Sequence, residues 1–350
     1  MKEEHFIRDI EIKNFKCFED FKAKGFGRVN LIGGKNNVGK TAFMEALELH
    51  LTSTDSFSLA FSLYNLVQRR QSSDRRERYF ELDFIYKNSS KLELKTNNKY
   101  IIVEYYDELD DYVDDISNEN NSDLKYEPSL KLSVNEHTKV FPINRIIDRP
   151  PMMRKPSNVT NELKVNFISS TITDEREIAV LYGSLIDLSK ESFLNESLKL
   201  FDDNIVALKQ KAIERGVILK LLLKDQEYPV LLSSLGEGIN RYIAILCAIW
   251  ASKDGVLFID EIENGIHYSN YDKLWEIILK VSEEAKCQLF ISTHSKECIE
   301  SYARVAKRLE DEEIAFIELG RNKENKIDSI IYPYEWLIDE VEQNHEVRGW

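Results

Sequence analysis

Two segments far apart in the chain carry residues suited to phosphate chemistry. Residues 34–41 read Gly-Lys-Asn-Asn-Val-Gly-Lys-Thr, and residues 256–261 read Val-Leu-Phe-Ile-Asp-Glu. The first segment has the spacing of a P-loop, whose glycines let backbone N–H groups surround a phosphate at the start of a helix. The second has four apolar residues, typical of a buried strand, that end on two acids. The backbone groups predicted to hold phosphate belong to Gly34, Asn36, Asn37 and Gly39.

Four side chains in these segments could divide the work of hydrolysing a nucleotide. The Lys40 ammonium is predicted to reach the β- and γ-phosphates, and the Thr41 hydroxyl to bind Mg²⁺. Asp260 is predicted to hold the metal through water, and Glu261 to act as the general base for an attacking water. A glycine turn and an unrelated acidic strand end are the alternative for each segment alone. Together the two segments favour an ATPase that converts ATP and water to ADP and phosphate.

The elements around these segments are those that such a site needs. Residues 28–32 form a short apolar run before the glycine loop, and residues 41–51 after it repeat apolar side chains at helical spacing. Residues 6–15 alternate apolar and polar side chains, which predicts an edge strand entering the same sheet. Further strands are predicted at residues 79–86, 91–94, 100–106, 130–134, 139–143, 163–169, 217–223, 228–232, 288–292, 314–319 and 327–332, and further helices at 56–67, 239–251 and 335–343.

The middle of the chain changes pattern twice. A proline-rich stretch around residues 150–156 predicts a boundary, and residues 174–215 keep apolar spacings of three and four that predict a helical hairpin or lid. The pattern therefore divides an α/β protein into three parts. Residues 1–173 hold the P-loop and a strand-rich N-terminal lobe, residues 174–216 form a helical insertion, and residues 217–350 complete the ATPase core.

Composition limits the class of protein. The 350 residues carry a net charge of −14, and nine acids without a lysine or arginine fall between residues 104 and 123. A solvated insertion or a docking surface for a basic partner would both explain this stretch.

Hydrophobic content is 43%, and no run is long enough for a membrane span or a signal peptide, so we expect a cytoplasmic protein without membrane contact. The four cysteines lack metal-site spacing, which favours free thiols.

Basic residues nevertheless gather in two places, which leaves nucleic acid open as a partner. Either group could contact an acidic surface, and surface charge without a ligand is the alternative for both. The two groups are Arg69, Arg70, Arg75, Arg76 and Arg78, and Arg145, Arg149, Arg154 and Lys155.

The order of these motifs resembles that of an ABC-class ATPase of the SMC-like, RecF-like and OLD (overcoming lysogenization defect) type. It begins with Lys13-Asn14-Phe15-Lys16-Cys17-Phe18 and the P-loop, continues through Ser234-Leu235-Gly236-Glu237 and Asp260-Glu261, and ends at Thr293-His294. Within this group the chain is most similar to the stand-alone OLD-type AAA ATPases of bacterial anti-phage systems such as PARIS and Septu. The resemblance covers nearly the whole chain and implies a P-loop NTPase fold of ABC-ATPase type.

The resemblance also implies roles for residues outside the two opening segments. Ser234, Gly236 and Glu237 match the signature that contacts the γ-phosphate bound by a second protomer, so a complete site needs a homodimer or a larger homo-oligomer. Residues 263–267 match the D-loop, and His294 matches the switch histidine that contacts the γ-phosphate. The usual glutamine between P-loop and signature is missing, since no Gln lies between Gln71 and Gln210. Ser169, Ser170 and Thr171 are the candidates for its place.

The resemblance implies two alternative functions. Only 56 residues follow His294, too few for the Toprim nuclease domain of OLD nucleases, so we expect a separately encoded effector that is a nuclease or Toprim-like protein. The chain would then sense and regulate that effector in anti-phage defence. The alternative is an ATP-dependent DNA-binding clamp of RecF or SMC type, in DNA repair or maintenance, which the arginine clusters favour and the net charge of −14 disfavours.

Overall fold

The computed structural model describes residues 6–71, 89, 91–106, 128–148, 163–170, 175–214 and 216–343. Contacts between residues separate the chain into two compact units. The first unit comprises Met1–Asp9, Ala23–Met44 and Glu162–Trp350, and the second comprises Ile10–Lys22 and Glu45–Asn161. These units follow contacts in space, whereas the predicted division at residues 173 and 216 follows motif order along the chain, so that division stays a prediction.

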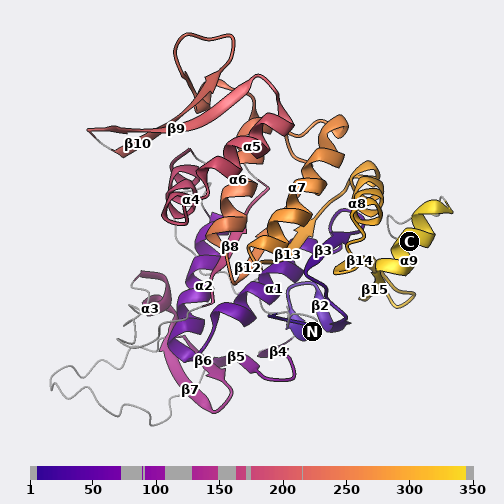
Figure 1. The fold of residues 1–350 in the computed structure, drawn as a ribbon. Helices are drawn as coiled ribbons and strands as arrows, with labels where there is room; N and C mark the ends of the chain where they lie inside the picture. The colour runs from indigo at the N-terminus through magenta and orange to yellow at the C-terminus, as the bar shows by residue number, and fades with distance from the viewer. Residues whose placement is uncertain are drawn as a thin grey trace. The chain divides into compact units, whose positions relative to one another are not determined.

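A six-stranded sheet forms the centre of the first unit, in the order β15-β14-β3-β13-β12-β8 (Figure 1). The five strands from β14 to β8 run parallel, and β15 pairs antiparallel at the edge. Parallel strands buried on both faces are apolar throughout, which is why the short apolar runs predicted these strands correctly. The strands are β3 (Val29–Gly33), β8 (Val165–Ile168), β12 (Val256–Ile259), β13 (Gln288–Ser292), β14 (Ile314–Arg321) and β15 (Ile327–Pro333).

The two faces of this sheet are filled differently. Alternate residues such as Leu257 and Leu289 join a large apolar cluster with the helices. The other face carries a row of phenylalanines, in which Phe258 stacks 5.6 Å from Phe290 and Phe26 meets the Phe290 ring edge-on at 5.3 Å. The helices of the cluster are α4 (Glu175–Asp187), α5 (Glu191–Phe201), α6 (Glu237–Ala251), α7 (Tyr271–Glu284), α8 (Lys296–Leu309) and α9 (Tyr334–Glu342).

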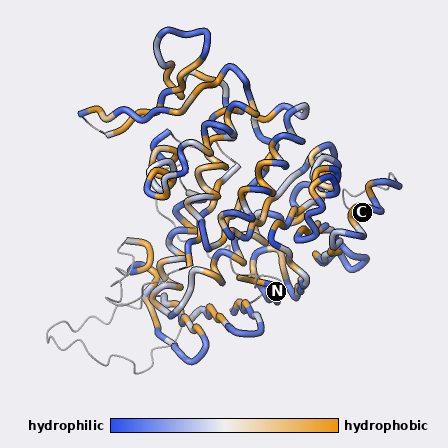
Figure 2. Tube along the Cα trace, in the orientation of Figure 1, coloured by the Kyte–Doolittle hydropathy of each residue, from blue (hydrophilic) through white to orange (hydrophobic). Residues whose placement is uncertain are grey.

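The predicted forty-residue helical segment is only partly helical. Helices α4 and α5 cover its first part, but β9 (Ile205–Ile213) then pairs with β10 (Gly216–Leu223) in a long antiparallel hairpin. The helical prediction for residues 202–214 was therefore wrong. The chain leaves α5 through Asp202, Asp203 and Asn204, a turn-forming sequence that the apolar spacing obscured. The loop after β10 is hydrophilic (Figure 2), and the short strand β11 (Val230–Leu231) and a turn of 3₁₀ helix, η1 (Leu232–Ser234), follow it.

The second unit is built on another six-stranded sheet, with the order β2-β1-β4-β5-β6-β7. Strand β1 lies between β2 and β4 in this sheet, so the prediction that residues 6–15 enter the P-loop sheet as an edge strand was wrong. The physical reason was visible in the alternation of apolar and polar residues, which fits a sheet buried on one face rather than a parallel sheet buried on both. Its strands are β1 (Asp9–Phe15), β2 (Phe18–Lys24), β4 (Lys91–Lys95), β5 (Tyr100–Tyr106), β6 (Ser129–Val134) and β7 (His137–Pro142).

Helices α2 (Ser56–Gln71) and α3 (Ile143–Asp148) complete the second unit. Two arginines of the first predicted basic group form bidentate ion pairs there. Arg69 binds Glu48, and Arg70 donates to both carboxylate oxygens of Glu45 at 2.7 and 2.8 Å. Their charge is therefore matched within the unit. The predicted strand at 79–86, the proline-rich boundary, residues 107–123 of the acidic stretch and the other basic residues of both groups except Arg145 lie outside the described residues.

Further findings concern the cysteines, metal-binding side chains and helix hydrophobicity in the described part of the chain. Cys247, Cys287 and Cys298 are buried thiols, and the Cys17 side chain is half-buried. No cluster of metal-binding side chains occurs among the described residues. Within the same ranges, every helix is too short or too polar to span a bilayer.

Candidate nucleotide-binding site

The P-loop leaves β3 and enters α1 (Lys40–Thr52) through backbone shapes that favour its sequence. Gly34 has φ of +137°, and a Cβ there would lie 2.3 Å from the Leu319 carbonyl oxygen, so only glycine fits. Gly39 has φ of +93° and Asn37 has φ of +62°, a region that asparagine tolerates better than most residues. Asn36 and Asn37 form the exposed part of the loop, so the predicted strand, loop and helix are confirmed.

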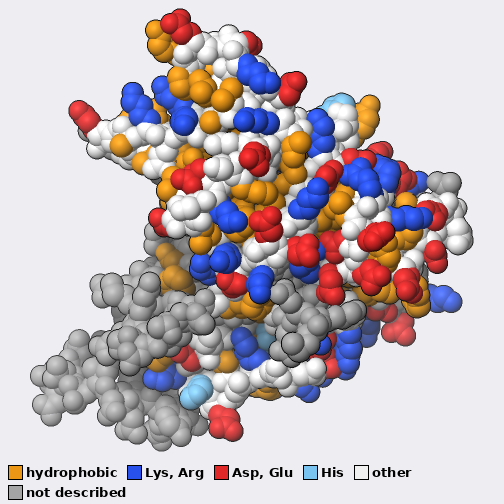
Figure 3. Space-filling view, in the orientation of Figure 1, with side chains coloured by type: hydrophobic (Ala, Val, Ile, Leu, Met, Phe, Trp, Pro, Cys, Tyr) orange, Lys and Arg blue, Asp and Glu red, His pale blue; other side chains and the backbone are white. Residues whose placement is uncertain are grey.

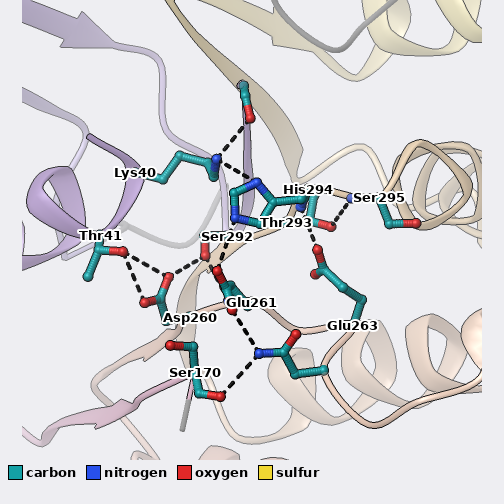
Figure 4. A network of polar contacts seen from close by, with 12 residues as sticks. Lys40, Thr41, Ser170, Asp260, Glu261, Glu263, Ser292, Thr293, His294 and Ser295 are labelled. Carbon is teal, nitrogen blue, oxygen red and sulfur yellow. Dashed lines mark hydrogen bonds and ion pairs between the residues drawn. The ribbon is translucent and has the colours of Figure 1, made fainter. Parts of the chain in front are cut away.

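Lys40 is the cation of the site and lies beneath the loop. Its Nζ donates to the carbonyl oxygens of Gly34 at 2.8 Å and Lys35 at 3.0 Å, and lies 3.0 Å from Nδ1 of His294 (Figure 4). Burial lowers the pKa of Lys40 to about 8, although Glu263, Asp260 and Glu261 oppose this shift. The Lys40 ammonium is therefore oriented by two backbone carbonyl groups rather than by a carboxylate.

Thr41 and Asp260 meet in spite of their separation in sequence. The Thr41 hydroxyl donates to the Asp260 carboxylate at 3.0 Å, and Ser292 Oγ at the end of β13 donates to the same carboxylate at 2.5 Å. Asp260 is buried, with 6% of its surface exposed. A hydroxyl and a carboxylate are the hard oxygen ligands that Mg²⁺ uses together with water and substrate phosphates. The residues present therefore fit a magnesium ion.

Glu261 forms the next link of the polar network. Its Oε1 lies 3.0 Å from His294 Nε2, and its Oε2 accepts from Asn264 Nδ2 at 2.8 Å. Its backbone has φ of +50°, an uncommon conformation for a glutamate, and its N–H donates to Ser292 Oγ at 2.8 Å. The side chain is one-third exposed, so the carboxylate faces both the network and solvent.

The loop after β8 reaches the same place. The Ser170 carbonyl accepts from Asn264 at 3.1 Å, and the Ile168 carbonyl accepts from the Asp260 N–H at 2.9 Å. Residues 169 and 170, two of the three candidates for the place of the missing glutamine, therefore lie beside the segment that carries Asp260 and Glu261. Thr171, the third candidate, lies outside the described residues.

Ser292 and Arg241 were not predicted as site residues, and Glu263 was predicted only as part of the D-loop segment. Ser292 bridges Asp260 and Glu261, and Glu263 accepts from the His294 N–H at 2.5 Å while its other carboxylate oxygen is buried without a partner. Arg241, inside α6, donates to the carbonyl oxygens of Ser169 and Asp260. The sequence carries a signal for Arg241 as well, because it is the single charged residue in the otherwise uncharged run 238–251.

The signature segment is exposed on the first unit. Ser234 lies in η1 and donates to the Leu231 carbonyl at 2.7 Å, Gly236 caps α6, and Glu237 is the first residue of that helix. All three are exposed. Gly238 packs tightly on Gly265 of the D-loop segment, because a Cβ on Gly238 would lie 2.3 Å from the Gly265 carbonyl oxygen. The structure therefore gathers Lys40, Thr41, Asp260, Glu261 and His294, and sets the signature on the helix beside the D-loop.

Comparisons with known proteins agree with this geometry. The family model described as "AAA domain, putative AbiEii toxin, Type IV TA system" matches residues 29–300. An "ATP/GTP phosphatase" of Helicobacter pylori is 26% identical over 332 residues, covering 86% of this chain and 88% of that protein. An uncharacterized protein of Methanocaldococcus jannaschii is 37% identical over 89 residues, which cover 25% of this chain and 39% of that protein.

Solved structures show the fold. An SMC head bound to the C-terminal winged-helix domain of ScpA has a TM-score of 0.55 at 13% identity, over 95% of this chain and 98% of that one. An SMC head from Pyrococcus furiosus with an extended coiled coil, also bound to the C-terminal domain of ScpA, has a TM-score of 0.51 at 11% identity, over 97% and 99%. The predicted fold class, a P-loop NTPase of ABC-ATPase type, is confirmed.

Proposed function

The chain belongs to the AAA-domain family whose model matches residues 29–300, and on this basis we propose that it binds ATP with Mg²⁺ and hydrolyses it. The observation that carries the proposal is the unbroken polar chain from Lys40 through His294 to Glu261, beside the Thr41–Asp260 pair. This network links Lys40, the proposed phosphate-binding cation, to Glu261, the proposed base for water, which supports the proposal. A bound Mg²⁺ would supply charge neutralisation between the phosphates and Asp260.

Each residue then has a task within this chain. The loop N–H groups of Gly34, Asn36, Asn37 and Gly39 would surround the phosphates, and Lys40 would exchange its carbonyl partners for phosphate oxygens. Glu261 would take a proton from the attacking water, while His294 and Asn264 fix the direction of its carboxylate. The Thr41 and Ser292 hydroxyls both donate to the Asp260 carboxylate and would fix its direction.

Steady-state phosphate release tests this function. Wild type should release phosphate from ATP only with Mg²⁺, and Lys40→Ala should lose both nucleotide binding and turnover. Lys35→Ala is the matched control, because Lys35 is exposed on the same loop and contributes its carbonyl rather than its side chain to Lys40. Equal phosphate release by wild type and Lys40→Ala would show that the site is not hydrolytic.

We further propose that the active unit is a homodimer or larger homo-oligomer with composite sites. The support is the exposed surface formed by Ser234, Gly236 and Glu237 together with Gly265 and Tyr268, of which Tyr268 is 66% exposed beside the D-loop. Exposed backbone N–H groups at a helix start suit a phosphate, and the signature of one protomer would present them to the nucleotide of the next. Light scattering tests this proposal: the molecular mass should increase when Mg²⁺ and ATP are added. An unchanged mass would contradict it.

The finer proposal is that nucleotide state regulates a separately encoded effector in anti-phage defence, as in stand-alone OLD-type ATPases. The family description names a putative toxin of a type IV system, and the SMC heads of similar fold are bound to a partner domain, which supports action through a second protein. Phage plating on cells that carry the gene with its neighbouring reading frames tests this. Protection should be lost with Lys40→Ala, and equal plating with and without the wild-type gene would count against the defence role.

An ATP-dependent DNA clamp is the second candidate, and one surface favours it. On the outer face of the β9–β10 hairpin, Lys209 lies directly opposite Lys220, and Lys211 is two residues along the strand from Lys209. Like charges at opposed positions repel unless an anion lies nearby. Figure 3 shows Lys and Arg side chains gathered over this part of the surface. ATP-dependent, salt-sensitive binding of duplex DNA, lost in Lys209→Ala/Lys211→Ala, would favour the clamp.

A further inference from the structure

Arg241 is a buried cation whose partners are backbone carbonyls. Only 6% of its surface is exposed. One guanidinium nitrogen donates to the Ser169 carbonyl at 2.5 Å, and the other donates to the Asp260 carbonyl at 2.5 Å and lies 3.4 Å from that of Glu261. The guanidinium therefore braces the chain where β8 and β12 both leave the sheet.

Burying Arg241 in this way costs folding free energy, so packing alone does not explain its presence. Burying a charge carries a desolvation penalty, and the Nε of Arg241 is buried without a hydrogen-bond partner. An apolar side chain would suit the surrounding run of α6, where Tyr242 to Trp250 are all buried. The brace acts on Glu261, whose backbone has φ of +50° and so needs its neighbours to hold it.

The same helix begins at the signature segment. Gly236 caps α6 and Gly238 touches Gly265 one turn before Arg241 reaches Asp260 and Glu261. Positions 238 and 241 lie on one face of the helix, so α6 contacts the 260–265 segment at two points. Because a helix moves as a rigid element, a displacement at its first turn changes the position of the guanidinium.

We propose that Arg241 is a positioning residue that sets the geometry of Glu261 and couples it to the signature segment at the start of α6. A nucleotide contacted by Ser234 and Gly236 would thereby control hydrolysis at the site in the same chain. This inference rests on the proposed ATPase function. It adds a residue that touches neither nucleotide nor water and acts through the backbone of residues 260 and 261.

Arg241→Met and Arg241→Lys test the inference against a matched control. Met keeps the length without donors, and Lys keeps a charge that cannot reach three carbonyls at once. Arg28→Met is the control, since Arg28 is equally buried in the same unit but binds Asp311, Ser282 and the Leu279 carbonyl. Four quantities are compared: melting temperature, Kd for ATP, kcat, and the dependence of the rate per chain on protein concentration.

Arg241→Met should keep the Kd for ATP within about twofold and lower kcat by roughly 100-fold, the loss typical of a misplaced catalytic group. Arg241→Lys should recover part of kcat. Arg241→Met should still assemble with ATP, but its rate of ATP hydrolysis per chain should no longer rise with protein concentration. In a Glu261→Gln background, Arg241→Met should lower the residual rate no further, because the brace acts through Glu261. Arg28→Met should lose thermal stability and keep kcat.

Three results would overturn the inference: wild-type kcat in Arg241→Met, an equal loss of kcat in Arg28→Met, or a further full loss in the Glu261→Gln background. If Arg241→Met does not fold, Arg241→Lys carries the same comparisons. Failure of the proposed function looks different, because Lys40→Ala would then hydrolyse ATP as fast as wild type. If ATP hydrolysis is lost in Lys40→Ala but unchanged in Arg241→Met, the ATPase function stands and only the proposed role of Arg241 is overturned.

Discussion

The ammonium of Lys40 lies 3.0 Å from Nδ1 of His294, whose Nε2 lies 3.0 Å from a carboxylate oxygen of Glu261. A protonated lysine can only donate, so Nδ1 accepts and the ring proton sits on Nε2, where it donates to Glu261. The histidine then links Lys40 to Glu261, the proposed general base. A phosphate that draws Lys40 away would free Nδ1 and change the hydrogen bonding of the base.

The pH dependence of nucleotide affinity should report Lys40. Burial lowers its pKa to about 8, and phosphate needs the charged form, which is the form present below that pH. The Kd for ATP should therefore be flat from pH 7 to 7.5 and rise by up to about tenfold per unit above pH 8. Lys40→Arg stays charged throughout and should show no such rise. Titration of ATP binding by calorimetry from pH 7 to 9.5 measures this, and a flat wild-type profile would contradict it.

Replacing His294 should separate binding from turnover. His294→Ala removes the imidazole between the two side chains, so Lys40 keeps two of its three partners and the Glu261 carboxylate keeps only Asn264. We expect a Kd for ATP within a few-fold of wild type and a kcat lower by about 100-fold, the usual size of a lost proton-transfer or positioning group. His137→Ala is the control, because His137 is an exposed histidine at the start of β7 in the second unit. A loss of binding equal to the loss of kcat would assign His294 to nucleotide binding instead.

Residue pattern predicted the parts of the site that depend on local sequence. The P-loop, the apolar strands and the acids at the end of β12 each follow from spacing within a few residues. These features are fixed by steric and burial rules that act locally. The meeting of Thr41 with Asp260 was expected on a different ground, the metal-binding role predicted for both motifs.

Features that depend on pairing between distant segments were missed or misassigned. The residues of β9 keep helical spacing, yet their pairing with β10 decides their structure. The alternation in β1 fitted a strand but did not identify its sheet. Ser292 looks ordinary in the sequence, and the D-loop match of Glu263 did not predict its contact with His294; only the fold brings these residues to Asp260 and His294. Tertiary context therefore decides what spacing alone leaves open.

Glu261→Gln should trap the ATP-bound state. Glutamine keeps the size of the side chain and can still bond Asn264, but it cannot take a proton from water. Binding of ATP should stay near the wild-type value, and turnover should fall by about 10²- to 10⁴-fold. The mass in light scattering should then stay raised for as long as ATP is present. Lys40→Ala/Glu261→Gln is the control and should remain at the mass without nucleotide. Turnover equal to wild type would remove Glu261 from the role of base.

Variants of Gly236 and Gly238 test the stability of α6 independently of its proposed contact with a second protomer. A Cβ on Gly236 meets nothing within 4 Å and its φ is −64°, so Gly236→Ala should fold with a melting temperature close to wild type. A Cβ on Gly238 would lie 2.3 Å from the Gly265 carbonyl, so Gly238→Ala should be destabilised by roughly 1–3 kcal/mol through overpacking.

Their effects on assembly should be the reverse of their effects on stability. The added methyl group of Gly236→Ala stands where the signature would approach the nucleotide of the next protomer, so this stable variant should bind ATP and fail to gain mass with it. ATP-dependent assembly and phosphate release in Gly236→Ala at wild-type levels would mean that the site is complete within one chain. Because the free chain has open space at Gly236, any loss of assembly must arise at the contact between chains rather than in the fold.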